Sequence, residues 1–435
     1  MSLLKFLMKN IEIGKKIKII KKDFEIEGFI IPKPELYEED FILVKLYNGY
    51  NIGIKIDENT KIIELGEKIK VGEFPKAEII KNPNLKNISL IHTGGTIASK
   101  IDYSTQAVSP AIQPEELFYI FPELKNIANV ERTILLFNIA SEDMLPKNWI
   151  KIAEAAYKEI NDKEIFGVII SHGTDTMHFT SAALSFFIRN LNKPIILTGA
   201  QRSSDRASSD AKMNFICSSY AAISNIAEVG IVMHASSNDD FCYFHRGTKV
   251  RKFHTTRRDA FKSVNDKPIA KIYYDGKIEI INKNYKERNE NRPELKAFFD
   301  ERVAMLKFYP NSKPEIIDIL VNNFDIRGIV IEASGLGHVA TNNEKSWIPY
   351  IKKNDNTLFA ITSQCIFGRV HPYVYTNTRI LSNLENVVFC EDMLSEVAYV
   401  KLGWLLAQEK DLKKLKELML TNFANEINYI SYYED

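Results

Sequence analysis

The sequence lacks the features that mark several specialised classes of protein. Its 57 Lys and Arg residues nearly balance 56 Asp and Glu residues, so it has no basic excess of the kind that nucleic-acid-binding surfaces usually carry. No apolar run approaches the roughly 18 residues of a membrane-spanning helix. The apolar patch within residues 1–9 is interrupted by Lys5 and Lys9 and precedes no cleavage site, so we expect no signal peptide.

Cysteine is also scarce. The four cysteines form no Cys-x-x-Cys pair and lie far apart, at Cys217, Cys242, Cys365 and Cys390. This spacing argues against a zinc site and against a disulfide framework, and it favours the reducing cytoplasm. His172 has no second His or Cys at ligand spacing, so we expect no metal site.

Nucleotide-binding loops are missing as well. No Gly-Lys-[Ser/Thr] follows the glycine pair at Gly94 and Gly95, so this stretch is not a P-loop. Gly335-Leu-Gly337 is only a fragment of a dinucleotide-binding fingerprint, and a simple turn explains it better. We therefore expect this chain to bind no ATP itself.

With 435 residues, 45% of them apolar and 26% charged, the chain is long enough for two or three globular domains. Residues 1–75 contain short alternating apolar runs, and Asn48-Gly49 between two of them is a strong hairpin signal. We predict a small all-β, barrel-like domain there, which serves for docking, for RNA contact or only as a structural appendage. A linker at residues 76–86 follows.

From residue 87 the pattern changes to strands that alternate with helices. We predict one α/β domain at residues 87–281, a polar interdomain crossing at 282–302, and a second α/β domain at 303–435. Each is expected to hold a parallel sheet with helices on both faces. The predicted strands are 88–91, 133–137, 166–170, 194–197, 229–233, 328–331 and 358–362, and the predicted helices are 149–160, 180–190, 210–227, 394–408 and 411–420.

Two predicted strands of the first α/β domain end in clustered hydroxyls, at Thr93-Gly-Gly-Thr96 and at His172-Gly-Thr-Asp-Thr176. A threonine hydroxyl is a weak nucleophile unless a base removes its proton, and a lysine coupled to a carboxylate can be that base. A third polar segment, His245-Arg-Gly-Thr-Lys-Val-Arg-Lys252 before Phe253-His-Thr-Thr-Arg-Arg258, contains such lysines. Backbone N–H groups around Gly95 and Thr174 are candidates to stabilise an oxyanion.

The third polar segment has a competing interpretation. Its cations form either a basic RNA-binding patch or an ordinary solvated surface; they are Arg246, Lys249, Arg251, Lys252, Arg257 and Arg258. The sequence pattern leaves both alternatives open.

Thr93-Gly-Gly-Thr-Ile-Ala98 and His172-Gly-Thr-Asp-Thr176, about eighty residues apart, resemble the paired signatures of the bacterial-type L-asparaginase/glutaminase family. Lys252, before Phe253-His-Thr-Thr256, resembles the lysine region of that family. The resemblance extends from about Ile88 to the C-terminus. It implies an amide hydrolase with two α/β domains.

By this resemblance, Thr96 is the nucleophile of the first motif, while Thr174, Asp175 and Lys252 form a second catalytic triad. Tyr103 is similar to the tyrosine on the lid that closes over the substrate. The resemblance does not settle which threonine performs which acylation step.

The family resemblance also implies substrate-binding residues. Ser141 and Glu142 fall where the family binds the α-carboxylate and α-ammonium groups, and Asp175 contributes to the same subsite. The commonest secreted asparaginases have glutamine at the position of Glu142. A carboxylate there suits an α-ammonium group.

The N-terminal β unit and His245-Arg-Gly-Thr-Lys-Val-Arg-Lys252 resemble a narrower group, the D subunits of archaeal tRNA-dependent amidotransferases. This implies a glutaminase that passes ammonia to a tRNA-binding E subunit, where ATP and Mg²⁺ activate the glutamate of Glu-tRNA(Gln). It also implies a homodimer of this chain within a two-plus-two heterotetramer. The alternatives are a stand-alone cytoplasmic L-asparaginase and, from another class, a non-catalytic RNA-binding scaffold.

Overall fold

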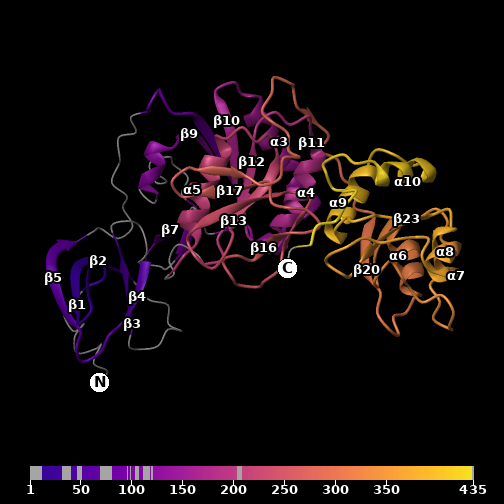
Figure 1. Ribbon diagram of the computed structural model, residues 1–435, viewed down its shortest axis with the longest axis horizontal. Coiled ribbons are helices and arrows are strands. Elements are labelled where there is room, and N and C mark those ends of the chain that lie inside the picture. Colours follow the sequence, from indigo (N-terminus) through magenta and orange to yellow (C-terminus); the bar gives the residue numbers. More distant parts are fainter. Residues whose placement is uncertain are drawn as a thin grey trace.

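The computed structural model describes residues 12–31, 41–46, 51–68, 81–95, 97, 99–102, 107–110, 118, 121–202 and 208–433. Three units follow one another along the chain, beginning with a separate strand-rich unit near the N-terminus (Figure 1). None of the described helices has the length and apolar character needed to cross a bilayer.

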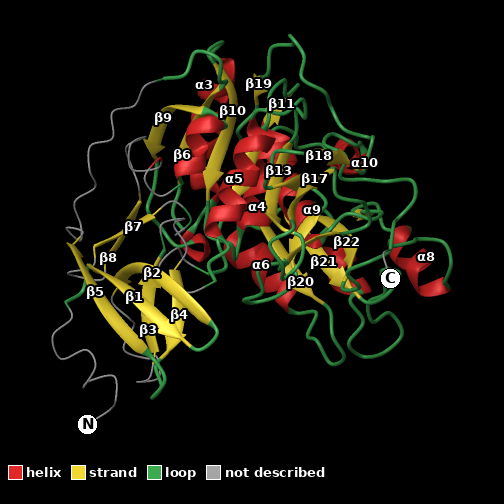
Figure 2. Cartoon of the chain, turned by 60° about the vertical axis from the view of Figure 1, so that its left-hand side comes forward, coloured by secondary structure: helices red, strands yellow, loops and turns green. Residues whose placement is uncertain are grey.

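The N-terminal unit is one antiparallel sheet in the order β4-β3-β2-β1-β5 (Figure 2). Its strands are β1 Lys15–Lys21, β2 Phe24–Ile31, β3 Phe41–Lys45, β4 Asn51–Lys55 and β5 Lys61–Lys68. The pairing of Lys45 with Asn51 confirms the predicted hairpin, although Asn48 and Gly49 lie outside the described residues. Strand β5 was not predicted from the sequence, because its lysines and glutamates weaken its apolar alternation.

The second unit is built on an eight-stranded sheet in the order β18-β17-β14-β13-β12-β10-β6-β9. The strands are β6 Asn87–His92, β9 Asn129–Leu135, β10 Ile165–Ser171, β12 Ile195–Thr198, β13 Val229–His234, β14 Phe241–Arg246, β17 Ala270–Tyr273 and β18 Ile278–Ile280. Strands β9, β6, β10, β12 and β13 are parallel, as predicted.

The other half of this sheet differs from the prediction, because β14, β17 and β18 run antiparallel. Only six residues, 235–240, join β13 to β14. A parallel crossover needs about a dozen residues or more, so the chain turns straight back here.

Helices cover both faces of the sheet. Alternate residues of β10 point to opposite sides: Val168 and Ile170 pack with α3 (Pro146–Asn161) and α4 (Met177–Phe187), while Ile169 packs with α5 (Ala211–Ala222). The period of two along a strand produces this division. The predicted α/β architecture is therefore confirmed.

Helix α4 ends three residues earlier than predicted. The next residues form β11 (Ile188–Arg189), which pairs with β19 (Glu294–Leu295) in the polar crossing segment. Asn190 has a φ of 53° and ends the short strand. Long-range pairing thus overrides the helical pattern of this segment.

The third unit has a fully parallel four-stranded sheet, β20-β21-β22-β23. Its strands are β20 Val303–Lys307, β21 Gly328–Ala333, β22 Leu358–Ser363 and β23 Val387–Phe389. One face packs against α6 Ile316–Phe324, α7 Ile348–Lys353 and α8 Thr376–Ser382, and the other against α9 Ser395–Leu406 and α10 Leu412–Leu420.

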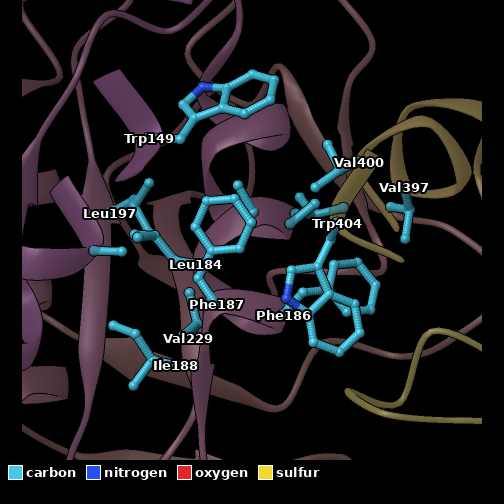
Figure 3. Close-up of a cluster of buried hydrophobic side chains, with 14 of the residues drawn as sticks. Trp149, Leu184, Phe186, Phe187, Ile188, Leu197, Val229, Val397, Val400 and Trp404 are labelled. Carbon is cyan, nitrogen blue, oxygen red and sulfur yellow. The ribbon is translucent and has the colours of Figure 1, made fainter. Parts of the chain in front are cut away.

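The two α/β units share one hydrophobic core. Side chains from α4 and α9 meet in it, and the rings of Phe186 and Trp404 stack with centroids 5.6 Å apart (Figure 3). Trp149 of α3 contributes to the same core. This packing joins the third unit to the helices that follow the predicted catalytic strands.

Smaller elements complete the described chain. They are the hairpins β7 Ser99–Asp102 with β8 Ala107–Pro110 and β15 Val250–Lys252 with β16 Phe261–Ser263, and the 3₁₀ helices η1 Pro122–Asn126 and η2 Ser141–Asp143.

Candidate active site

Three neighbouring parallel strands end together at one edge of the large sheet. In β6, β10 and β12, His92 pairs with Ser171, and Ser171 pairs with Thr198. Beyond the paired residues, the Thr93 side-chain hydroxyl donates to the Ser171 carbonyl at 2.8 Å. The loops that follow β6 and β10 are therefore held side by side, where open α/β sheets place their ligands.

The glycines of the first motif permit an unusually close approach. Gly95 has a φ of +75°, and a Cβ added to it would lie 2.9 Å from the carbonyl carbon of His172. A Cβ on Gly94 would lie 2.0 Å from the carbonyl oxygen of Ile139. Both positions require glycine, because any side chain would collide with backbone. The two motifs thus pack directly against each other.

Lys252, at the end of β15, contacts two polar side chains of the second motif, Thr174 and Asp175. Its Nζ donates to Thr174 Oγ1 at 2.9 Å and lies 2.6 Å from Asp175 Oδ1. The Lys252 side chain is only 9% exposed, whereas the Asp175 side chain is 65% exposed. A deeply placed amine therefore contacts a hydroxyl and an accessible carboxylate, as the sequence pattern predicts.

His172 has a structural role. The imidazole is buried, with Nδ1 2.6 Å from the Gly173 carbonyl oxygen and Nε2 2.8 Å from Thr180 Oγ1. Burial lowers the pKa of His172 to about 4, so the ring is neutral at pH 7. Both ring nitrogens thus have hydrogen-bond partners within the protein.

The 3₁₀ helix η2 approaches the second motif from the side. Thr176 Oγ1 donates to the Ser141 carbonyl at 2.6 Å, and a Cβ on Gly173 would lie 2.9 Å from Ser141 Oγ. Ser141 is buried and Glu142 is exposed. Ser141 and Glu142 therefore lie on a short helix that is fastened to the loop of Asp175, the third residue predicted to bind the substrate.

Thr96 and Tyr103 lie outside the described residues. Their neighbours are described: Gly95 contacts the second motif, and Ile97 is buried in the core that packs on α5. The roles predicted for Thr96 and Tyr103 stay predictions.

Comparison with known families agrees with this geometry. The model "Asparaginase, N-terminal" matches residues 87–286, and "Glutaminase/Asparaginase C-terminal domain" matches residues 302–419. A third model, "GatD N-terminal domain", matches residues 11–65.

Relatives that match over nearly the whole length of this chain show which family it belongs to. The D subunit of the glutamyl-tRNA(Gln) amidotransferase of Pyrococcus furiosus is 49% identical over 427 residues, which cover 96% of this chain and 95% of that protein. The corresponding protein of Sulfolobus acidocaldarius is 47% identical, covering 99% and 95%. The chain belongs to the GatD family, the D subunits of glutamyl-tRNA(Gln) amidotransferases.

Solved structures extend the comparison. The thermostable L-asparaginase from Thermococcus kodakarensis aligns with a TM-score of 0.69 and 26% identity, covering 79% of this chain and 99% of that one. A probable cytoplasmic L-asparaginase from Campylobacter jejuni aligns with a TM-score of 0.63 and 26% identity, covering 78% and 100%. The GatD family thus carries an asparaginase-like fold.

A charged cluster behind Lys252, largely buried, was not predicted from the sequence. Glu396, in the first turn of α9, forms an ion pair with Arg251, whose Nε lies 3.1 Å from Glu396 Oε1, and His178 Nε2 lies 4.0 Å from the same oxygen. Arg251 precedes Lys252, and His178 is on the helix that follows Asp175. The third unit therefore fastens both segments that carry the triad, and only the tertiary structure reveals this contact.

The RNA-patch interpretation is wrong for two of its cations. Arg246 is buried and lies 2.9 Å from Glu228, and Lys249 is buried 2.7 Å from Asp392 of the third unit. Burial lowers the pKa of Lys249, while the Asp392 carboxylate opposes that shift. These two residues join parts of the protein and are not available to RNA.

Within the described ranges, no group of three or more His, Cys, Asp or Glu side chains is arranged to hold a metal ion. The thiols of Cys217, Cys242 and Cys390 are buried, and all four cysteines are unbridged.

Proposed function

We propose that this chain is the glutaminase subunit of the tRNA-dependent amidotransferase that converts Glu-tRNA(Gln) to Gln-tRNA(Gln). The observation that carries the proposal is the contact of Lys252 Nζ with Thr174 Oγ1 and Asp175 Oδ1. This contact occurs in a chain that matches GatD proteins over nearly its full length.

In the proposed reaction, a threonine hydroxyl attacks the side-chain amide carbon of glutamine. The proton of the attacking hydroxyl passes to Lys252 Nζ, through Thr174 or through a water between the two loops, and Asp175 stabilises the resulting ammonium. Backbone N–H groups near Gly95 and Thr174 stabilise the oxyanion. The Lys252 ammonium returns this proton to the departing nitrogen, which leaves as ammonia, and water then hydrolyses the acyl-enzyme to release glutamate.

We assign the first attack to Thr96, on the strength of its position in the first motif. Tyr103 is proposed to close over the substrate and to assist proton transfer. Ser141 is proposed to bind the α-carboxylate of glutamine, while Glu142 and Asp175 bind its α-ammonium group. The proximity of η2 to Gly173 and Thr176 supports this subsite.

The proposed partner is a GatE-like E subunit that binds Glu-tRNA(Gln). ATP and Mg²⁺ are expected at that subunit, where they activate the glutamate, and this chain is expected to bind no cofactor. We further propose a homodimer of this chain within a two-plus-two heterotetramer in the cytoplasm. The relatives are named as one subunit of an amidotransferase, which supports the existence of a partner.

Amide hydrolysis tests the proposal against its main alternative. The purified chain, alone and with an E subunit and Glu-tRNA(Gln), is assayed for ammonia release from glutamine and from asparagine. We expect glutamine hydrolysis that rises when partner and charged tRNA are present. Strong asparagine hydrolysis at the same rate with and without tRNA would instead favour a stand-alone asparaginase.

A further inference from the structure

Two cations of the third polar segment, Arg257 and Arg258, are not explained by the proposed catalytic site. They line a surface cavity of about 280 Å³ together with Arg202, Ser208, Ser237 and Thr256. The described lining thus consists of three guanidinium groups and three hydroxyl-bearing side chains, without a carboxylate. Such a lining is suited to an oxyanion.

Carboxylates outside the lining hold two of these guanidinium groups in place. Arg257 donates from Nε and Nη2 to Asp259, at 2.8 and 3.1 Å. Arg258 donates from Nη1 to Asp239 at 2.8 Å, and from Nη2 to the Ser237 carbonyl. A guanidinium has five N–H groups, so in the described structure each arginine keeps donors beyond these bonds.

The two carboxylates are themselves fixed and charged. Burial would raise the pKa of Asp259, but hydrogen bonds from Arg257 and Lys262 lower it to about 2. A hydrogen bond from His234, 2.9 Å away, is the main cause that lowers the pKa of Asp239. These supports orient the arginines before any ligand binds, which reduces the entropy cost of binding.

We propose that the cavity lined by Arg202, Arg257 and Arg258 binds a phosphate group, and that the phosphate belongs to the RNA backbone. The choice of RNA rests on the proposed function, in which a charged tRNA enters the complex. Arg257 is 56% exposed and Arg258 is 20% exposed, so one is accessible at the rim and the other lies deeper. A backbone phosphate reaches such a surface cavity without entering the protein core.

The position of the cavity connects it to the triad. Arg257 and Arg258 lie on the loop of the β15–β16 hairpin, and Lys252 lies at the end of β15. The loop is internally fastened: Phe253 N donates to the Ala260 carbonyl at 2.7 Å, and His254 Nδ1 accepts from Thr256 N and Arg257 N, both at 3.0 Å. A phosphate held by this loop therefore binds to the same hairpin that places Lys252 beside Thr174.

The test uses the complete complex with the E subunit. Arg257→Gln is compared with wild type and with Arg327→Gln, a matched control that removes a 43% exposed, ion-paired arginine in the third unit. We expect Arg257→Gln to keep the glutaminase rate that is measured without tRNA. The factor by which Glu-tRNA(Gln) raises this rate should fall at least about fivefold. The slope of log Kd for tRNA against log salt should fall by about one. Arg258→Gln should behave in the same way.

Two arms distinguish the source of the phosphate. Inorganic phosphate is titrated into wild type and Arg257→Gln at constant ionic strength, with binding followed by calorimetry. Phosphate binding lost in Arg257→Gln, with tRNA stimulation and salt slope unchanged, would overturn RNA as the source. If wild type and Arg257→Gln bind phosphate equally and respond equally to tRNA, the proposed phosphate site would be overturned altogether. A wild-type complex whose glutaminase rate does not change with Glu-tRNA(Gln) would contradict the proposed function. The phosphate titration would still show whether the cavity binds phosphate.

Discussion

At the scale of single residues, the proposed chemistry depends on the amine of Lys252. Replacing it in Lys252→Met keeps the length and apolar stem of the side chain but removes the contacts with Thr174 and Asp175. We expect glutamine hydrolysis to fall by roughly 10²–10⁴-fold, the usual loss for a group that acts in proton transfer or transition-state stabilisation. The measurement is kcat for ammonia release.

Lys271→Met is the matched control for this change. Lys271 pairs with Glu279 at 3.2 Å in the antiparallel part of the sheet, away from the triad. Its variant should keep the wild-type rate. A Lys252→Met protein with wild-type kcat would remove Lys252 from the mechanism.

Buried histidines predict a pH dependence of stability. Burial lowers the pKa of His172 to about 4 and that of His178 and His245 to about 3, against 6.5 for an exposed histidine. The unfolded chain therefore binds protons first as the pH falls, so the free energy of unfolding should decrease below about pH 6.5. Burial raises the pKa of Glu396, so this one carboxyl group binds its proton more readily in the folded state and adds stability as the pH falls. It therefore offsets only part of the effect of the three histidines.

Urea unfolding at pH 7.5, 6.5 and 5.5 checks this prediction. The ion-paired carboxylate of Asp259 does not affect stability between pH 7.5 and 5.5. Its pKa in the folded protein is about 2, so the stability that it contributes is lost only at lower pH. Equal free energies of unfolding at the three pH values would contradict the assignment of neutral, buried imidazoles.

At the scale of elements, the site depends on how closely the loop after β6 approaches the loop after β10. Gly95→Ala should strongly reduce glutaminase activity, because its Cβ would lie 2.9 Å from His172 backbone and because φ is +75°. Gly335→Ala is the matched control, since Gly335 also has a positive φ, +52°, but no other atom of the described residues, apart from its chain neighbours, lies within 4 Å of the added Cβ. Each variant is assayed for kcat and for thermal stability.

The comparison of these two glycines separates backbone strain from steric contact. A positive φ costs both variants of the order of 1 kcal/mol of stability. Only Gly95→Ala must also move the two strand-end loops apart. Equal activity of the two variants would mean that the contact between the loops does not matter for catalysis.

The strands of the large sheet differ in how well they could be predicted from the sequence. Strand ends that carry Thr93 and Thr174 were predictable, because apolar runs followed by glycine and hydroxyl residues mark the carboxyl edge of a parallel sheet. The antiparallel strands β14, β17 and β18 were not, since strand direction depends on pairing partners far along the chain. The burial of Arg246 and Lys249 was hidden for the same reason.

At the scale of the whole molecule, charged residues buried between the α/β units hold them together. Lys249 Nζ lies 2.7 Å from Asp392 Oδ2, and both side chains are fully buried. Lys249→Met should lower the free energy of unfolding by about 3–5 kcal/mol, because it leaves the Asp392 carboxylate buried without its cation. Lys353→Met, which breaks an exposed ion pair with Asp318, should cost about 0–1 kcal/mol.

Urea unfolding of both variants measures this difference. A small loss for Lys249→Met would mean that Asp392 is protonated or rehydrated, and that the units are joined mainly by their apolar core. The Phe186 and Trp404 stack and its neighbours would then account for the union of the two units.

The central claim, that the triad supplies ammonia for the amidation of Glu-tRNA(Gln), has a direct test. The complex of Lys252→Met with the E subunit is supplied with Glu-tRNA(Gln), ATP and Mg²⁺, and either glutamine or ammonium chloride as the nitrogen source. We predict that Gln-tRNA(Gln) forms with ammonium chloride at the wild-type rate, and that glutamine supports little or none. Formation of Gln-tRNA(Gln) from glutamine at the wild-type rate in this variant would contradict the account.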